Sequence, residues 1–243
     1  MQIVERGLII RETQYKEADV MLTVLTECAG KISVLARGAK RKSSKFSAAV
    51  QLLTYSEFTL YESAGRYTLN EAEPIELFYE IREDIVKLSL ASYFAEVLDQ
   101  AADEDTINPE LLRLGLNSLY ALSKTAIEKE KIKTVFELKI AQLAGYSPNV
   151  SNCGVCLRET DFSSLDVKNG SLLCKKCDTG YHLNIDASVV DAMRFILSED
   201  IKKIFSFSIN QKSMKLLSNV TEEYLHFHFD RSFKTGTFYK SLL

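Results

Sequence analysis

Four of the five cysteines form two close pairs in the second half of the chain, and this spacing constrains the fold more than any other feature. The pairs are Cys153-Gly154-Val155-Cys156 and Cys174-Lys175-Lys176-Cys177, with seventeen residues between them. Each CxxC turn can present two thiolates to one tetrahedral ion, and a hairpin between the turns brings the pairs together, as in zinc ribbons. Four protein ligands leave no open coordination position. The spacing therefore predicts one structural zinc per chain, bound by Cys153, Cys156, Cys174 and Cys177.

A redox dithiol is the alternative interpretation of the first pair. It would require a lowered thiol pKa at a helix N-terminus within a βαβ unit, whereas the flanking residues favour a loop and a hairpin. A zinc deaminase is excluded, because no histidine is followed two residues later by glutamate. The remaining cysteine, Cys28, lies in a segment that reads as strand and is expected to be packed.

The first 73 residues read as five short strands rich in Val, Ile, Thr, Tyr and Phe. They are predicted at Ile3–Glu12, Val20–Glu27, Ile32–Arg37, Leu52–Tyr61 and Arg66–Glu71. Gly30 and Gly65 supply hairpin turns, because glycine tolerates the positive φ that tight connections need. Five strands in so short a segment favour a small closed barrel, and a partly open sandwich is the alternative.

Helical periodicity replaces the strand pattern after Pro74, which we expect to end the sheet. Helices are predicted on one face from Ile81 to Leu98, from Asn108-Pro109 onward, over Ile127–Ala144, over Asp186–Leu197 and over Asn210–Phe229. The cysteine segment interrupts them, and Asn169-Gly170 predicts a type I′ hairpin there. The predicted class is α+β, with a barrel at 1–75, helical parts at 76–148 and 183–243, and a zinc ribbon at 149–182.

A basic loop follows the third predicted strand. Residues 37–45 contain five positive and no negative side chains, namely Arg37, Lys40, Arg41, Lys42 and Lys45. Such a loop can follow a phosphate backbone without reading bases. A solvated charge run is the plain alternative, but small barrels often combine basic loops with stacking aromatics. The candidate stacking residues are Tyr55, Phe58, Tyr61 and Tyr67, although each is individually more typical of a barrel core.

The formal charge of −3, taken as an average, disfavours a nucleic-acid partner, but the charge is segregated along the chain. Residues 71–110 carry 12 acidic and 2 basic side chains, whereas residues 1–70 carry 7 acidic and 10 basic ones. A basic surface beside an acidic segment can steer a polyanion to one face. The average charge therefore does not exclude DNA.

Signatures of catalysis and of membrane insertion are missing from the sequence. No phosphate-binding GxxxxGK[ST] or GxGxxG, no HExxH and no GxSxG occurs, so we predict a binding protein without catalytic residues. There is no signal-peptide pattern and no run of about 18 apolar residues. We expect a cytoplasmic protein with no membrane partner.

The order of these parts resembles the bacterial RecO family of recombination mediators across essentially the whole chain. The resemblance is carried by the Ala36-Arg37-Gly38 loop, by the Gly145-x-x-Pro148 junction that precedes the two CxxC pairs, and by the terminal Tyr224–Phe229 motif. The segment around Lys234-Thr235 departs from the family, which usually has Lys-Ser, and we assign it no role.

The resemblance implies an OB-fold followed by a helical domain that carries a zinc ribbon. It further implies ATP-independent binding of single- and double-stranded DNA, annealing of complementary strands, and association with the nucleoid. The implied partners are RecR, the C-terminal tail of single-stranded-DNA-binding protein and, indirectly, RecA. A zinc-ribbon RNA-binding or transcription-associated protein remains the alternative, since it would share the metal site and the basic loop.

Overall fold

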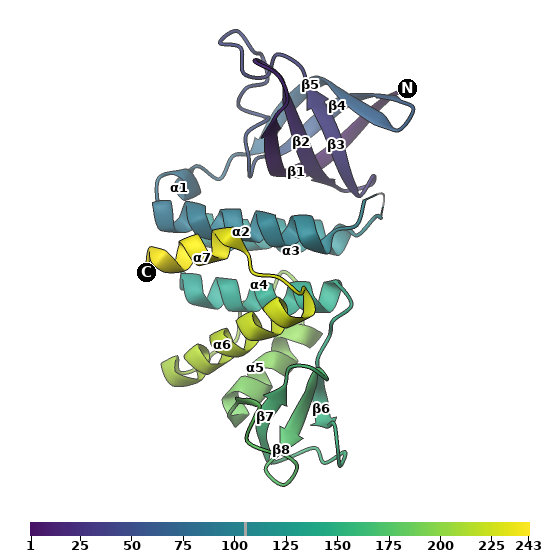
Figure 1. The fold of residues 1–243 in the computed structure, drawn as a ribbon. Coiled ribbons are helices and arrows are strands. Elements are labelled where there is room, and N and C mark those ends of the chain that lie inside the picture. The colour runs from purple at the N-terminus through teal and green to yellow at the C-terminus, as the bar shows by residue number, and fades with distance from the viewer. Residues whose placement is uncertain (105) are drawn as a thin grey trace. The chain divides into compact units, whose positions relative to one another are not determined.

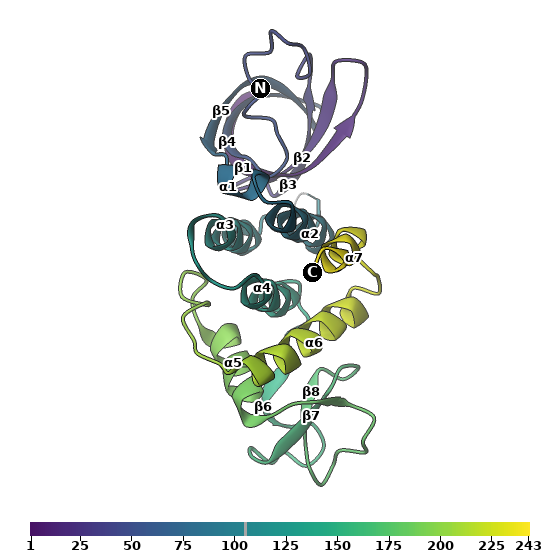
Figure 2. The ribbon, with the colours of Figure 1, turned by 90° about the vertical axis from the view of Figure 1, so that its left-hand side faces the viewer.

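Five strands at the N-terminus close into a barrel, in a computed structural model that describes residues 1–104 and 106–243 (Figure 1). The strands are β1 (Gln2–Gln14), β2 (Val20–Thr26), β3 (Lys31–Ala36), β4 (Tyr55–Ser63) and β5 (Arg66–Glu76). Their order around the barrel is β1-β2-β3-β5-β4, and only the β3–β5 pairing is parallel. Figure 2 shows the barrel nearly end on as a ring. The predicted closed barrel is confirmed, and the open sandwich is wrong.

Alternating apolar residues fill the barrel, because successive side chains of a strand point to opposite faces. Ile9, Leu22, Val34, Phe58 and Leu60 lie at its centre and are all buried. Gly30 and Gly65 adopt positive φ in their hairpins, as predicted. At Gly30 a Cβ atom would also come within 2.5 Å of the Thr106 carbonyl oxygen, so no larger residue fits there.

The prediction that Pro74 ends the sheet is wrong. Pro74 lies inside β5 and pairs with Ser56 of β4. Proline is tolerated here because β3 pairs with β5 only at Tyr67 and Thr68, so the other side of β5 does not need the missing N–H donor.

The helices in the same compact unit as the barrel are α1 (Tyr79–Arg82), α2 (Ile85–Ala101), α3 (Pro109–Lys124) and α7 (Lys234–Ser241). The single predicted helical face from Ile81 to Leu98 is divided into two helices. The division occurs at Asp84, whose carboxylate accepts hydrogen bonds from the backbone N–H groups of Val86 and Lys87. A cap of this kind starts a new helix instead of continuing the old one.

Asp99 of α2 joins the barrel to the helices. The ammonium of Lys31 donates to the Asp99 backbone carbonyl at 2.7 Å, and Arg11 forms an ion pair with the Asp99 carboxylate at 3.3 Å. Part of the acidic segment at 71–110 therefore serves a structural purpose in this unit.

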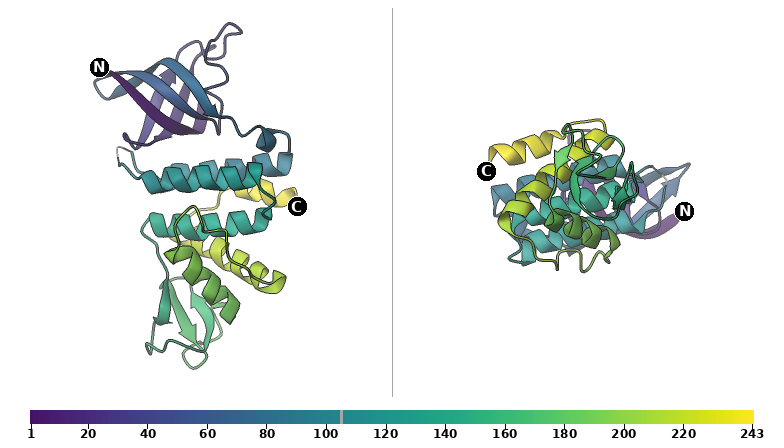
Figure 3. Two further views of the ribbon diagram at one scale, coloured as in Figure 1. Left: turned by 180° about the vertical axis from the view of Figure 1, so that it is seen from behind. Right: turned by 90° about the horizontal axis from the view of Figure 1, so that it is seen from below.

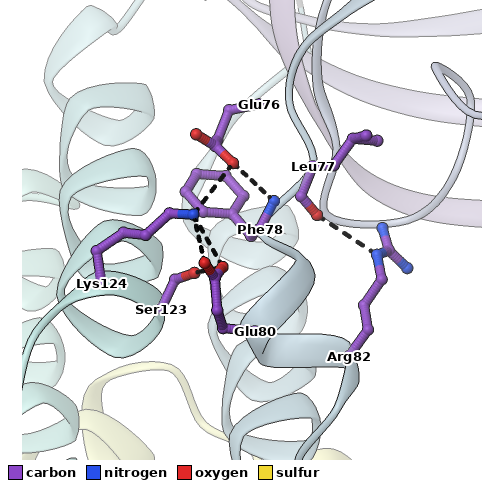
Figure 4. A network of polar contacts seen from close by, with 7 residues as sticks. All are labelled: Glu76, Leu77, Phe78, Glu80, Arg82, Ser123 and Lys124. Carbon is purple, nitrogen blue, oxygen red and sulfur yellow. Dashed lines mark hydrogen bonds and ion pairs between the residues drawn. The ribbon is translucent and has the colours of Figure 1, made fainter.

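A second polar network holds α1 to α3 (Figure 4). Both oxygens of the Glu80 carboxylate accept from the Lys124 ammonium, at 2.7 and 2.9 Å, and one also accepts from Ser123. Glu76, at the end of β5, accepts from the Phe78 backbone N–H. These contacts fix the turn by which the chain leaves the barrel.

Residues 126–232 form the second compact unit, whereas residues 1–125 and 233–243 form the first. The second unit contains α4 (Lys129–Leu143), α5 (Ala187–Ser198) and α6 (Gln211–His228), and a sheet of β6 (Asn149–Cys153), β7 (Phe162–Asp166), β8 (Ser171–Cys174) and β9 (Leu183–Asn184). The sheet order is β6-β8-β7-β9. Gly145, with φ of 90°, ends α4 as the sequence predicts.

The β7–β8 connection differs from the predicted type I′ turn. Gly170 has positive φ but Asn169 does not, and four residues separate the paired Asp166 and Ser171. A type I′ turn needs positive φ at both central residues. Here Asp166 instead accepts hydrogen bonds from the backbone N–H and the side-chain amide of Asn169, which stabilises a longer loop.

No helix in the described part of the chain is long and apolar enough to cross a lipid bilayer.

Candidate nucleic-acid interface and metal centre

The basic loop belongs to a segment that leaves β3 at residue 37 and re-enters the barrel at β4, projecting from one end of the barrel (Figures 1 and 3). The structure places the five predicted cations on the surface of this segment: Arg37, Lys40, Arg41, Lys42 and Lys45 are all exposed. Short turns support them, since the Arg41 N–H donates to Gly38 and the Ser44 N–H donates to Arg41. The loop is therefore a folded structure with its charges turned outward.

Lys40 differs from the other cations of the loop. Its ammonium lies 3.2 Å from a Glu12 carboxylate oxygen and 3.3 Å from the Gln14 side-chain oxygen. The side chains of Arg37, Arg41, Lys42 and Lys45 have no hydrogen bond or ion pair within the described residues. Four cations are consequently available to an external anion, and the fifth must first exchange partners.

Both ends of the segment are fastened to neighbouring elements. At the start, the Gly38 N–H donates to the Asp19 carboxylate at 2.7 Å, and Gly38 has φ of 65°. At the end, the Arg82 guanidinium of α1 donates to the Leu52 carbonyl at 2.7 Å and to the Thr54 hydroxyl at 3.2 Å. Desolvation by burial lowers the pKa of Arg82, but the group keeps its charge at neutral pH. Sequence reasoning missed these anchors, which are distant in sequence and carry no motif.

A hollow of about 610 Å³ lies between the loop and β5. Its basic wall consists of Arg37, Arg41 and Lys45, and its acidic wall consists of Glu71 and Glu73, beside the neutral Asn70. Ser44 and Phe46 also line it. The acidic wall could not be predicted from the sequence, because a strand prediction does not show which loop lies over the strand.

The four candidate stacking aromatics differ in their burial and contacts in the structure. Phe58 is fully buried in the barrel core, so its assignment as a stacking residue is wrong. Tyr55 donates its hydroxyl hydrogen to Glu27 at 2.5 Å, and Tyr67 packs against the core. Tyr61 alone of the four is a largely exposed ring, at 52% exposure.

The four paired cysteines converge in the second unit. Their Sγ atoms all lie within 4.8 Å of one another, and those of Cys156 and Cys174 are 3.6 Å apart. Cys153 ends β6 and Cys174 ends β8, so adjacent strands of one sheet deliver the two pairs. Four sulfur atoms at this spacing can bind one metal ion.

The environment of the thiols favours thiolates at some positions only. Burial raises the pKa of Cys153, but backbone N–H groups that include that of Cys174 outweigh it and lower the pKa to about 6. The neighbouring Cys156 thiol, together with burial, raises the pKa of Cys177 to about 12. Four thiolates packed so closely would repel one another, and a bound cation would remove that repulsion.

The residues around the cluster fit a closed metal centre. Phe162 and Leu173 pack against the buried Cys153 and Cys174, whereas Cys156 is exposed, so apolar side chains cover one side of the cluster. At Gly154 in the first CxxC turn, a Cβ atom would lie 2.3 Å from the Ser171 hydroxyl, so only glycine lets this turn lie against β8. Neither cysteine pair begins a helix in a βαβ unit, which argues against the redox alternative.

Among the described residues, Cys28 and the two histidines of α6, His226 and His228, belong to no such cluster. Cys28 is exposed, so the expectation that it is packed is wrong. The reason is that it follows the end of β2 and lies in the turn before β3. His228 hydrogen-bonds the Val167 carbonyl at 2.9 Å and packs against Tyr224 with the rings tilted by 47° and their centroids 4.2 Å apart. This histidine therefore ties α6 to the β7–β8 loop.

Comparisons with known proteins cover both units. Residues 1–78 match the family described as Recombination protein O N terminal, and residues 82–236 match Recombination protein O C terminal. The DNA repair protein RecO of Alkaliphilus metalliredigens is 33% identical over 234 residues, which span 95% of each chain. That of Acetivibrio thermocellus is 35% identical over 241 residues, 97% of this chain and 95% of the relative. That of Caldicellulosiruptor bescii is 29% identical over 236 residues, 97% and 96% of the two chains.

Proposed function

The chain belongs to the RecO family of DNA repair proteins, and from this premise we propose that it binds single- and double-stranded DNA through the basic loop. The observation that carries the proposal is the set of exposed cations Arg37, Arg41, Lys42 and Lys45, which have no partner within the described residues. Unpaired charges lose no internal contact when they bind phosphate. They support binding to the backbone, which does not depend on base sequence.

Annealing of complementary strands follows from charge neutralisation. Two phosphate chains repel each other, and a basic surface that contacts both lowers this cost while it leaves the bases free to pair. Such a step needs no nucleotide hydrolysis. We therefore propose that the protein anneals complementary strands without ATP.

The family membership supports a wider role as a recombination mediator. In this role the protein acts with RecR to load RecA onto DNA coated by single-stranded-DNA-binding protein, whose C-terminal tail it contacts. These partners rest on the family resemblance, since no surface described above identifies them.

The metal that best suits the four cysteines is zinc, one per chain. A tetrahedral zinc with Zn–S distances of about 2.3 Å holds its sulfur atoms about 3.8 Å apart, close to the Cys156–Cys174 distance of 3.6 Å. Zinc bound here would neutralise the crowded thiolates and stabilise the ribbon. Cys153, Cys156, Cys174 and Cys177 would fill all its positions, so the role is structural.

The DNA-binding proposal is tested by neutralising three loop cations together, with Arg41, Lys42 and Lys45 each replaced by Ala. We expect weaker binding to every sequence, and a single-strand salt dependence whose log–log slope is shallower by about 2, since each lost contact contributes about 0.7. Annealing of complementary oligonucleotides without ATP should slow in parallel, with and without single-stranded-DNA-binding protein.

The matched control replaces three exposed lysines of the second unit, Lys202, Lys203 and Lys212, which changes the net charge equally. If the control weakens DNA binding as much as the loop variant, the loop assignment is wrong. A strong preference for RNA over DNA in competition would instead favour the RNA-binding alternative.

A further inference from the structure

The hollow between the loop and β5 is lined by side chains of both charges, and binding to the DNA phosphate backbone alone does not explain this. A surface that only follows phosphates should be uniformly basic. Here the basic wall (Arg37, Arg41 and Lys45) faces the same space as two carboxylates, Glu71 and Glu73. Neither carboxylate has an ion pair or hydrogen bond within the described residues. Like the cations, they are available to a ligand.

A β-bulge in β5 turns these acidic side chains into the hollow. Leu69 pairs with Leu60 and Glu71 pairs with Thr59, so Asn70 is an extra residue between two ladder positions. Without the bulge, Leu69 and Glu71 would point to the same side, into the barrel. With it, Leu69 and Ala72 pack on the core, while Glu71 and Glu73 are exposed. Bulges often re-aim side chains at binding sites in this way.

The remaining lining suits a planar, polar ligand. Phe46 packs one part of its ring on the barrel core and lines the hollow with another. Ser44 also lines the hollow, and its buried hydroxyl oxygen has no hydrogen-bond partner among the described residues, so it can bond to a polar group of a ligand. The volume of about 610 Å³ falls within the range of about 300–1,000 Å³ that is typical of small-ligand sites.

We propose that this hollow binds one unstacked nucleotide of a single strand, with its phosphate on the basic wall and the edge of its base on the acidic wall. The inference deepens the proposed DNA-binding function and rests on it. Duplex DNA keeps its base edges paired and stacked, so the site serves single strands only. The basic wall supplies affinity, and the carboxylates supply a preference among bases.

The chemistry of the acidic wall selects guanine. An ionised carboxylate only accepts hydrogen bonds, and guanine offers two adjacent donors, N1–H and the N2 amino group, to its two oxygens. Thymine offers one N–H between two carbonyl oxygens, which repel a carboxylate. A bidentate contact of this kind discriminates between bases by at least about fivefold.

The test compares two 12-mers, dT12 and d(TTG)4, by fluorescence anisotropy with the full-length protein. We expect d(TTG)4 to bind at least about fivefold more tightly than dT12. Glu71→Gln combined with Glu73→Gln should bring this ratio close to one. The same variant should bind dT12 as well as or better than the unmodified protein, because it removes negative charge beside the phosphates.

The matched control is Glu17→Gln combined with Glu83→Gln, two exposed carboxylates of the same unit that do not line the hollow. It should leave the ratio unchanged. Equal binding of the two oligonucleotides by the unmodified protein would overturn the inference. So would an unchanged ratio in the Glu71 and Glu73 variant with both affinities raised, since the carboxylates would then merely repel DNA.

Failure of this inference can be told apart from failure of the proposed function. Suppose that the loop variant at Arg41, Lys42 and Lys45 binds both oligonucleotides more weakly, and that the unmodified protein binds the two with equal affinity. The proposed DNA binding is then supported and the proposed nucleotide site is wrong. If that loop variant binds both oligonucleotides normally, the proposed interface itself is wrong.

Discussion

Lys40 and Lys42 stand two positions apart in one loop, and their surroundings differ. Lys40 reaches back to Glu12 and Gln14 of β1, whereas Lys42 extends from the loop with no partner in the described residues. A surface ion pair is weak, at about 0–1 kcal/mol, but it must be broken before the lysine can bind phosphate. The two lysines should therefore contribute unequally to DNA binding.

Lys42→Ala should reduce the steepness of the single-strand salt dependence by about 0.7 on the log–log scale, the value of one phosphate contact. Lys40→Ala should change it less. Glu12→Gln provides the reciprocal check, because it frees Lys40 and should strengthen binding. Equal effects of the two lysine substitutions, measured as affinity against salt concentration, would contradict this difference.

At the scale of elements, the connection from the barrel to the helices depends on α1, a helix of only four residues. So short a helix is not stable by itself. The contacts of Glu80 with Lys124 and Ser123 of α3 hold it in place (Figure 4). Because Arg82 of the same helix anchors the segment that contains the basic loop, the position of α1 also affects the proposed DNA-binding surface.

Hydrogen bonds from Lys124 and then Ser123 lower the pKa of Glu80 from its ordinary 4.5 to about 2. A carboxylate with a lowered pKa in the folded state stabilises the protein above its unfolded pKa, and the effect is lost as the pH falls through its folded pKa. Glu80→Gln should therefore lower the melting temperature slightly at pH 7, and the difference should disappear between about pH 4.5 and 2. A constant difference across this range would rule out the charged contact as its cause. Glu83→Gln, an exposed neighbour, is the control.

The sequence predicts those elements whose signals are local. Val20–Thr26, which is rich in β-branched residues, and α6, which Asn210 caps through the Ser213 N–H, lie within a few residues of their predicted bounds. The helix α7 was missed, because its stability comes from contacts that are distant in sequence. Phe233 packs edge-on against Tyr93, and Thr235 donates to Glu96. The same holds for the bulge at Asn70, since its effect depends on the neighbouring strand.

The candidate sites follow the same rule. The cysteine cluster is predictable, because two CxxC turns and one hairpin determine it within a short stretch of chain. The basic loop is predictable as a run of charges. The sequence does not predict that Lys40 is paired while the other four cations are available, because the partner of Lys40, Glu12, lies on another strand. Sequence patterns thus identify the residue types, and the fold decides which of them remain available.

At the scale of the whole molecule, the net charge of −3 is an average over an acidic segment and a basic loop that have different roles. The acidic segment at 71–110 contributes Asp99 and Glu80 to internal contacts, so part of its charge is neutralised within the first unit. The basic loop belongs to this unit as well, whereas the four cysteines belong to the second. The proposed DNA-binding loop and the candidate metal site therefore lie in different compact units.

This separation predicts what loss of the metal would do. Purified protein should contain about one zinc per chain, and Cys174→Ser should abolish it, measured by elemental analysis. Because a structural zinc contributes on the order of 10 kcal/mol of folding free energy, the second unit should unfold at a lower temperature in calorimetry and be cut by proteases between residues 149 and 182. The affinity for single-stranded DNA should change by less than about twofold, since the loop and its anchors lie in the first unit.

Lys176→Ala replaces an exposed residue between two of the cysteines, should keep the zinc and serves as the control. A loss of DNA affinity in the Cys174 variant as large as that of the loop variant would show that the metal supports the interface, and the two units would then have to be treated as coupled.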